Sequence, residues 1–132
     1  MLCKVLAAAA LLAALGGCAS VGDRAGAADE VALRLLTAVG GHDGATACAL
    51  LAPETAAEVV ESADKPCPEA ILEEDLPAPG AVARTEVYGQ WAQVRLTTDT
   101  LFLAAFAGGW RVVAAGCTAR GERPYNCVLQ GG

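Results

Sequence analysis

The feature that most constrains the fold is an alternation of strand-like runs and turns over residues 81–117. The runs, rich in β-branched, aromatic and aliphatic residues, lie at 82–88, 91–97, 100–106 and 110–115. Turn residues separate them, at 89–90, 98–99 and 108–109. Short runs of this composition between turns are typical of antiparallel strands joined by hairpins. The sequence therefore predicts a four-stranded antiparallel meander, which the rest of the chain must cover.

Helical patterns precede this stretch. Apolar residues recur at helical spacing from Ala28 to Val39, and Gly40-Gly41 is expected to end that helix. Shorter helices are expected at 45–51, with Asp43 as N-cap, at 54–63 and at 69–74. The predicted fold class is α+β, with N-terminal helices packed on a curved antiparallel β-meander.

The chain of 132 residues has room for one domain with a thin core. Its 55% hydrophobic content is raised by alanine, and only six residues are aromatic. The core must therefore consist mainly of leucine, valine and alanine. A core of this kind usually needs covalent support.

The N-terminal residues have the pattern of an export signal. One positive charge, Lys4, precedes an apolar run over residues 5–15 that is shorter than the about 20 residues of a membrane-spanning helix. The run ends in Leu15-Gly16-Gly17-Cys18, which resembles the lipobox of bacterial lipoproteins. This resemblance implies that Cys18 becomes the lipid-modified first residue of the mature protein. An ordinary signal peptide, or a buried alanine-rich helix, is the alternative.

The expected organisation follows from this pattern. Residues 1–17 would be a lipoprotein signal peptide, 18–26 a flexible tether, and 27–132 a single domain. The lipid would hold that domain to the cell membrane on its extracytoplasmic face.

Four cysteines remain after Cys3 leaves with the signal and Cys18 carries the lipid. An even remainder in an exported chain indicates two disulfides, and four cysteines allow three pairings. The local pairing, Cys48 with Cys67 and Cys117 with Cys127, closes the shortest loops and is the one predicted. A metal centre is not expected, because there is no C-x-x-C pair and only one histidine.

Two segments carry a wider resemblance. Residues 43–53 (DGATACALLAP) and 109–117 (GWRVVAAGC) are similar to segments of small uncharacterised lipoproteins of high-GC Gram-positive bacteria in the nuclear transport factor 2 (NTF2-like) superfamily. The resemblance implies a cone-shaped α+β fold. The sequence departs from it after Cys117, where Arg120, Arg123, Pro124 and Tyr125 are expected to form a loop in place of a longer strand.

Charge is concentrated in one segment. Residues 54–75 hold eight acidic side chains and one basic one, Lys65. The segment could bind a cation or a basic partner, although a solvated face is the simpler interpretation. Nucleic-acid binding is not expected, because no basic stripe is present to meet phosphates. No motif for a cofactor occurs.

The candidates for catalysis are few. Isomerases and cyclases of the superfamily use an acid or a His–Asp pair inside the cone, and this chain offers His42-Asp43, Glu86 and Asp99. His42 and Asp43 share a tight turn in which Asp43 is better explained as a cap. Glu86 is expected on an outward, salt-bridged position beside Arg84, and Asp99 with its neighbouring threonines in a hairpin. The sequence favours a binding role over a catalytic one.

The candidate partner surface consists of Trp91, Arg120, Arg123 and Tyr125. Trp91 alternates with Gln93 and Arg95, so its indole is expected on a polar face, either for a partner or over an arginine stem. Trp110 alternates with apolar residues and is expected in the core. The function expected is therefore a cell-envelope lipoprotein domain that binds a protein or a small ligand, and the alternative is an enzyme acting on a small molecule in the cavity.

Overall fold

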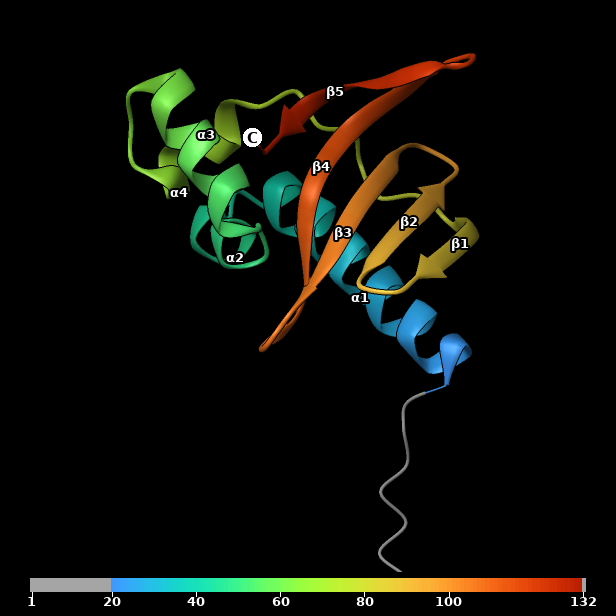
Figure 1. Cartoon of the computed structure of the whole chain (residues 1–132). Coiled ribbons are helices and arrows are strands. Elements are labelled where there is room, and N and C mark those ends of the chain that lie inside the picture. The colour runs from blue at the N-terminus through green and yellow to red at the C-terminus, as the bar shows by residue number, and fades with distance from the viewer. Residues whose placement is uncertain (1–19, 132) are drawn as a thin grey trace, which may run out of the picture.

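The computed structural model describes residues 20–131, in which helices pack against a twisted antiparallel sheet (Figure 1). The sheet contains β1 (Val82–Tyr88), β2 (Trp91–Leu96), β3 (Thr100–Phe106), β4 (Gly109–Arg120) and β5 (Arg123–Gln130), side by side in that order. The helices are α1 (Val21–Gly40), α2 (Gly44–Ala49), α3 (Pro53–Ala63) and α4 (Cys67–Ala70), followed by a 3₁₀ turn, η1 (Ile71–Glu73). The predicted α+β class is confirmed. The predicted signal peptide and Cys18 lie outside the described residues.

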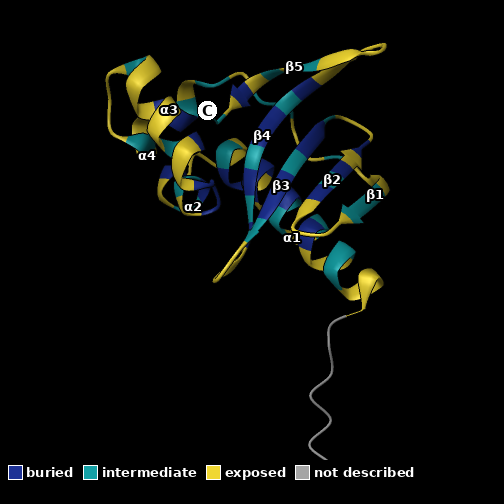
Figure 2. Ribbon diagram, in the orientation of Figure 1, coloured by how far each residue is buried: buried dark blue, intermediate teal, exposed yellow. Residues whose placement is uncertain are grey.

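The first helix begins earlier than the sequence pattern indicated. The Ser20 hydroxyl accepts the backbone N–H of Asp23, and the Asp23 carboxylate accepts the N–H of Ser20 in return. This reciprocal capping box starts the helix at Val21. The flexible tether predicted for residues 18–26 is therefore wrong from Val21 onward. The prediction failed because the first turns of α1 are mostly exposed and carry no apolar stripe (Figure 2).

The short helices α2 to α4 form a compact group that one disulfide holds together. The Asp43 carboxylate accepts the N–H of Thr46 at 3.1 Å and caps α2 as predicted, and this bond lowers the pKa of Asp43. Cys48 of α2 is bonded to Cys67 of α4, which confirms the predicted pairing. Gly44 allows the close approach of these helices, because a Cβ there would lie 1.8 Å from the carbonyl oxygen of Pro68.

The sheet extends further than predicted at its C-terminal edge. The first three strands lie where the sequence placed them, to within one residue, but β4 continues to Arg120 and pairs with a fifth strand, β5. The loop expected from Arg120 to Tyr125 is therefore wrong, because these residues form a hairpin. Gly121 makes the turn with a φ of +65°. Cys117 and Cys127 are directly opposite in this hairpin and form the second predicted disulfide.

The polar composition of residues 118–126 concealed β5. Pro124 also counts against a strand, since proline donates no hydrogen bond. It is accommodated because β5 is an edge strand of the sheet.

The core lies between α1 and one face of the sheet. Small and branched side chains of α1 are buried here, namely Ala28, Ala32, Leu35 and Leu36. The inward residues of β2, β3 and β4 meet them, namely Ala92, Val94, Leu101, Leu103, Trp110 and Val112. Trp110 is 9% exposed, as predicted for a core residue, and the Arg24 guanidinium lies 5.2 Å from its ring centre. Because α1 packs on one face of the sheet, the opposite face has no covering helical layer (Figure 1).

Candidate functional site

The face of the sheet that α1 does not cover carries most of the aromatic side chains. Five of the six aromatic residues lie on it, and Trp110 is the sixth. They are Tyr88, Trp91, Phe102, Phe106 and Tyr125. The strand register explains the arrangement. Tyr88 of β1 is opposite Trp91 of β2, which is in turn opposite Ala104 of β3. Along β3, Phe102 and Phe106 alternate with the inward-facing Leu101 and Leu103. We call these five residues the aromatic face.

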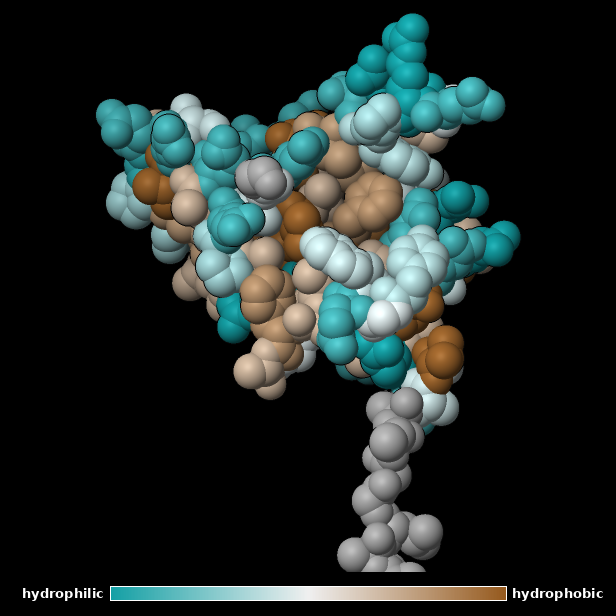
Figure 3. Space-filling view, in the orientation of Figure 1, coloured by the Kyte–Doolittle hydropathy of each residue, from teal (hydrophilic) through white to brown (hydrophobic). Residues whose placement is uncertain are grey.

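Three members of the aromatic face are solvent-exposed to an unusual degree for such side chains. Trp91 is 54% exposed, Tyr88 53% and Phe106 42%. Figure 3 shows this side of the molecule, where apolar surface gathers between the helical group and the hydrophilic strands β1 and β2. Exposed apolar surface rimmed by polar groups is typical of sites that bind another molecule.

A polar network joins Tyr88, Gln93 and Tyr125 on this face. The amide of Gln93 donates to the hydroxyl of Tyr125 at 3.2 Å, and the Tyr88 hydroxyl donates to the Gln93 carbonyl at 3.2 Å. The ring of Tyr125 stacks edge-on against Phe102, with centres 5.1 Å apart. Burial, and then the nearby Glu86 carboxylate, raise the pKa of Tyr88. These contacts hold the rings in place before any ligand arrives.

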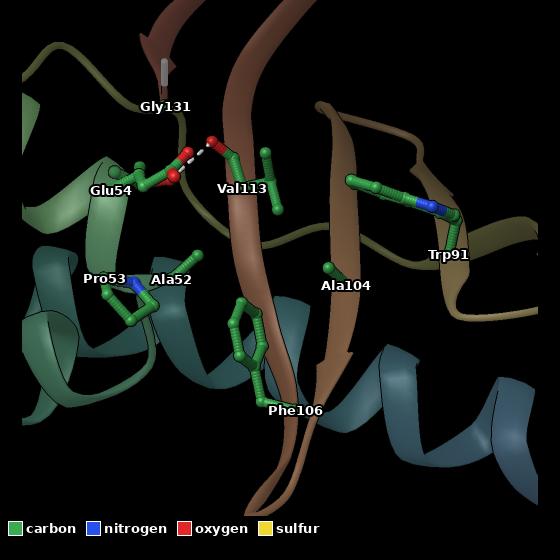
Figure 4. Close-up of a pocket in the computed structure, with 9 residues that line it drawn as sticks. Ala52, Pro53, Glu54, Trp91, Ala104, Phe106, Val113 and Gly131 are labelled. Atoms are coloured by element: carbon green, nitrogen blue, oxygen red, sulfur yellow. Dashed lines mark hydrogen bonds between the residues drawn. The ribbon is translucent and has the colours of Figure 1, made fainter.

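The lower part of the aromatic face is hollowed into a pocket of about 310 Å³. Ala104 and Val113 form its floor, and the rings of Trp91 and Phe106 stand on two of its sides (Figure 4). The N-terminal end of α3 closes the remaining side with Ala52, Pro53, Glu54 and Thr55, next to Gly131. A pocket of this size is at the lower end of the range that small-molecule sites occupy.

Backbone pairing positions α3 against the pocket. The N–H of Val112 donates to the carbonyl of Leu50, and the N–H of Ala52 donates back to the carbonyl of Val112, both at 2.8 Å. The fully buried Thr55 hydroxyl then donates to the carbonyl of Val113 at 2.9 Å. Because three hydrogen bonds tie this segment to β4, Glu54 is held at the rim of the pocket.

The predicted partner residues are divided between two places. Trp91 lines the pocket and Tyr125 belongs to the network above it, so the structure brings these two onto one face. Arg120 and Arg123 are opposite each other at the exposed tip of the β4–β5 hairpin (Figure 1), and neither lines the pocket. The loop surface expected to combine both arginines with Tyr125 is therefore not formed.

The catalytic candidates do not meet. His42 is exposed in its turn with a φ of 57°, and Asp43 caps α2. Glu86 pairs with Arg84 at 2.6 Å on the outward side of β1, as predicted. None of the three lines the pocket. Within residues 20–131 the acidic, histidine and cysteine side chains form no group of three that could hold a metal ion.

Asp99 has a role that sequence reasoning missed. Its carboxylate accepts the N–H groups of Thr100, Gly116 and Cys117 at 2.8, 2.9 and 3.1 Å, and so fastens the β2–β3 turn to β4 beside the disulfide. Burial raises the pKa of Asp99, and the accepted hydrogen bonds oppose that shift. In the sequence, Asp99 is only an aspartate among threonines in a turn. That pattern predicts a hydrogen bond within the turn but gives no information about the distant strand that the carboxylate reaches.

Comparison with other proteins does not assign a family. The chain matched no known protein family, no curated protein and no solved structure. Across residues 20–131, no helix combines the length and apolar character needed to cross a membrane.

Proposed function

We propose that this protein is a lipid-anchored domain of the cell envelope that binds a partner or a small ligand through the aromatic face. The observation that carries the proposal is the placement of five of six aromatic side chains on the uncovered face of the sheet. A soluble domain with few aromatic residues would gain more stability by burying them. The exposure of three of them, Tyr88, Trp91 and Phe106, beside a pocket favours recognition.

Export and anchoring are supported by the sequence. The apolar run at 5–15 and Leu15-Gly16-Gly17-Cys18 fit a lipoprotein signal, with Cys18 as the lipidated residue. The two disulfides are consistent with an oxidising compartment outside the cytoplasm. An NTF2-like cone is part of the same proposal, supported by the order of helices before a curved meander and by the segments at 43–53 and 109–117.

A binding role is favoured over catalysis by the composition of the pocket. Its walls are apolar or aromatic, and Glu54 is the one ionisable side chain among the residues that line it. General acid–base chemistry needs a group within hydrogen-bond reach of the reacting atom and usually a second group to orient it. The pocket supplies shape and contact area instead.

The test places a photoreactive phenylalanine analogue at position 91 of the full chain, expressed with its leader. Position 60 serves as the control, because Val60 is an exposed apolar residue, 40% accessible, on α3 and outside the pocket. We expect crosslinked adducts from position 91 and not from position 60, together with a diacylglyceryl mass on Cys18. Equal crosslinking from both positions, or an unmodified Cys18, would contradict the proposal.

A further inference from the structure

The pocket on the aromatic face has a charge pattern that selects its ligand. The rings of Trp91 and Phe106 stand on two sides of the pocket, and Glu54 supplies one negative charge at the rim (Figure 4). Among residues 20–131, no basic side chain lines the pocket. Aromatic rings together with a carboxylate are the groups that attract an ammonium ion.

Glu54 is free to meet a ligand. The ion pairs within residues 20–131 are Lys65–Glu73 and Arg84–Glu86, so Glu54 has no basic partner there. It accepts no capping hydrogen bond either, since α3 begins at Pro53 without a side-chain cap. Seven further acidic residues follow Glu54 along residues 54–75, so the segment that Glu54 begins carries a net negative charge.

The end of α3 supplies an opposing effect. A helix N-terminus carries about half a positive charge and favours anions. Glu54 sits in that first turn and already provides a full negative charge. An anionic ligand would therefore meet a carboxylate where it needed a free donor, whereas a cation would meet an unpaired acid.

We propose that the pocket binds a small organic cation, a primary or quaternary ammonium attached to an apolar body. The apolar body lies on Ala104 and Val113 between the rings of Trp91 and Phe106, and the ammonium group faces Glu54. This inference rests on the proposed function, because it names the ligand class of the same face. The pocket volume of about 310 Å³ suits a molecule of this size.

The experiment compares three soluble probes of similar shape on the full chain in nanodiscs of zwitterionic lipid. These are 2-phenylethylammonium, neutral 2-phenylethanol and anionic 3-phenylpropionate, followed by tryptophan fluorescence and by ligand-detected magnetic resonance. We expect the ammonium to bind about tenfold more tightly than the alcohol, in line with a cation–π contact combined with an ion pair. The propionate should bind more weakly than either. Equal affinities for all three would overturn the proposal.

Substitutions test which residue gives the selectivity. Glu54→Gln should weaken ammonium binding about five- to tenfold and leave the alcohol unchanged, because it removes the charge and keeps the shape. Glu61→Gln is the matched control, with the same charge change at an exposed position of α3 outside the pocket. Trp91→Ala should weaken both probes. An ammonium preference that survives Glu54→Gln, or that is lost equally in Glu61→Gln, would refute the assignment.

Two further outcomes separate this inference from the proposed function. If position 91 forms crosslinked adducts but the pocket shows no preference for the ammonium probe, the proposed binding face stands and the proposed cation specificity is refuted. Sedimentation that showed a dimer through the aromatic face, abolished by Trp91→Ala, would identify a second copy of the chain as the occupant and would also overturn the inference.

Discussion

Replacing Asp99 with alanine should destabilise the domain, because its carboxylate joins the β2–β3 turn to β4. The bond to Thr100 is local, but those to Gly116 and Cys117 connect positions 17 and 18 residues apart. A hydrogen bond to a charged group contributes about 1.5–3 kcal/mol. Because the carboxylate is only partly buried, solvent replaces some of that contribution, and we expect Asp99→Ala to lower the free energy of unfolding by about 2–4 kcal/mol.

Urea unfolding of the full chain, with both disulfides intact, measures this loss. The change should lower the melting temperature by about 10–20 °C for a domain near 100 residues. Asp75→Ala is the control, since Asp75 is exposed and its side chain makes no hydrogen bond or ion pair with the described residues. That control should stay within about 0.5 kcal/mol. Equal effects of the two substitutions would show that the Asp99 bonds to β4 contribute nothing.

The pH dependence gives a second check with a definite sign. Burial raises the pKa of Asp99, so the folded state holds this proton more tightly than the unfolded state does. The stabilisation that comes from binding this proton is full below the unfolded pKa, about 3.9 for aspartate, and is lost as pH rises through the folded pKa. The free energy of unfolding of the natural protein, relative to that of Asp99→Asn, which does not titrate, should therefore rise as pH falls from neutral. A fall in this relative stability with falling pH would mean that the accepted hydrogen bonds outweigh burial.

Three other changes test the packing. Gly44→Ala should lower the free energy of unfolding by about 3 kcal/mol, because its Cβ would lie 1.8 Å from the Pro68 carbonyl oxygen. Gly40→Ala places its Cβ where nothing lies within 4 Å and should stabilise α1 by about 0.5–1 kcal/mol. Similar effects of both substitutions in urea unfolding would contradict this packing. Arg24→Ala should lower the free energy of unfolding by about 1 kcal/mol and change the fluorescence emission of Trp110, because the guanidinium lies over the indole and donates to the Gly89 carbonyl. Unaltered emission and stability would mean that the start of α1 does not pack on the sheet. Replacing Cys48 and Cys67 with serine should lower the free energy of unfolding by about 3 kcal/mol. The same change at Cys117 and Cys127 should lower it slightly less, because that disulfide closes a sequence separation of 10 and not 19. The opposite order in thermal melts without reductant would show that strain or residual structure outweighs loop length.

The meander could be predicted because each of its turns is marked in the sequence. Gly89-Gln90 and Gly108-Gly109 interrupt runs with strong strand composition, and burial then alternates along β2 as the side-chain period requires. The Asp43 cap and the two disulfides were accessible for the same reason, since each depends on residues close in sequence.

The elements that were missed depend on contacts between distant residues. The start of α1 is supported by Arg24 against Trp110 and Gly89, and β5 becomes a strand by pairing with β4 despite its polar composition. The pocket shows the same limit. The sequence placed Trp91 on an outward face, but Glu54 reaches that face only because the Leu50–Val112 pairing brings the start of α3 beside β4.

The distribution of aromatic side chains connects the stability of this domain with its function. The core contains one aromatic residue, Trp110, and otherwise leucine, isoleucine, valine and alanine, whose burial stabilises less per residue. The two disulfides and the Asp99 bonds to β4 supply support that a richer core would have made unnecessary. If the aromatic face were only structural, moving its rings inward would relieve that need. Their retention on an uncovered face is the reason why we propose that a molecule binds there.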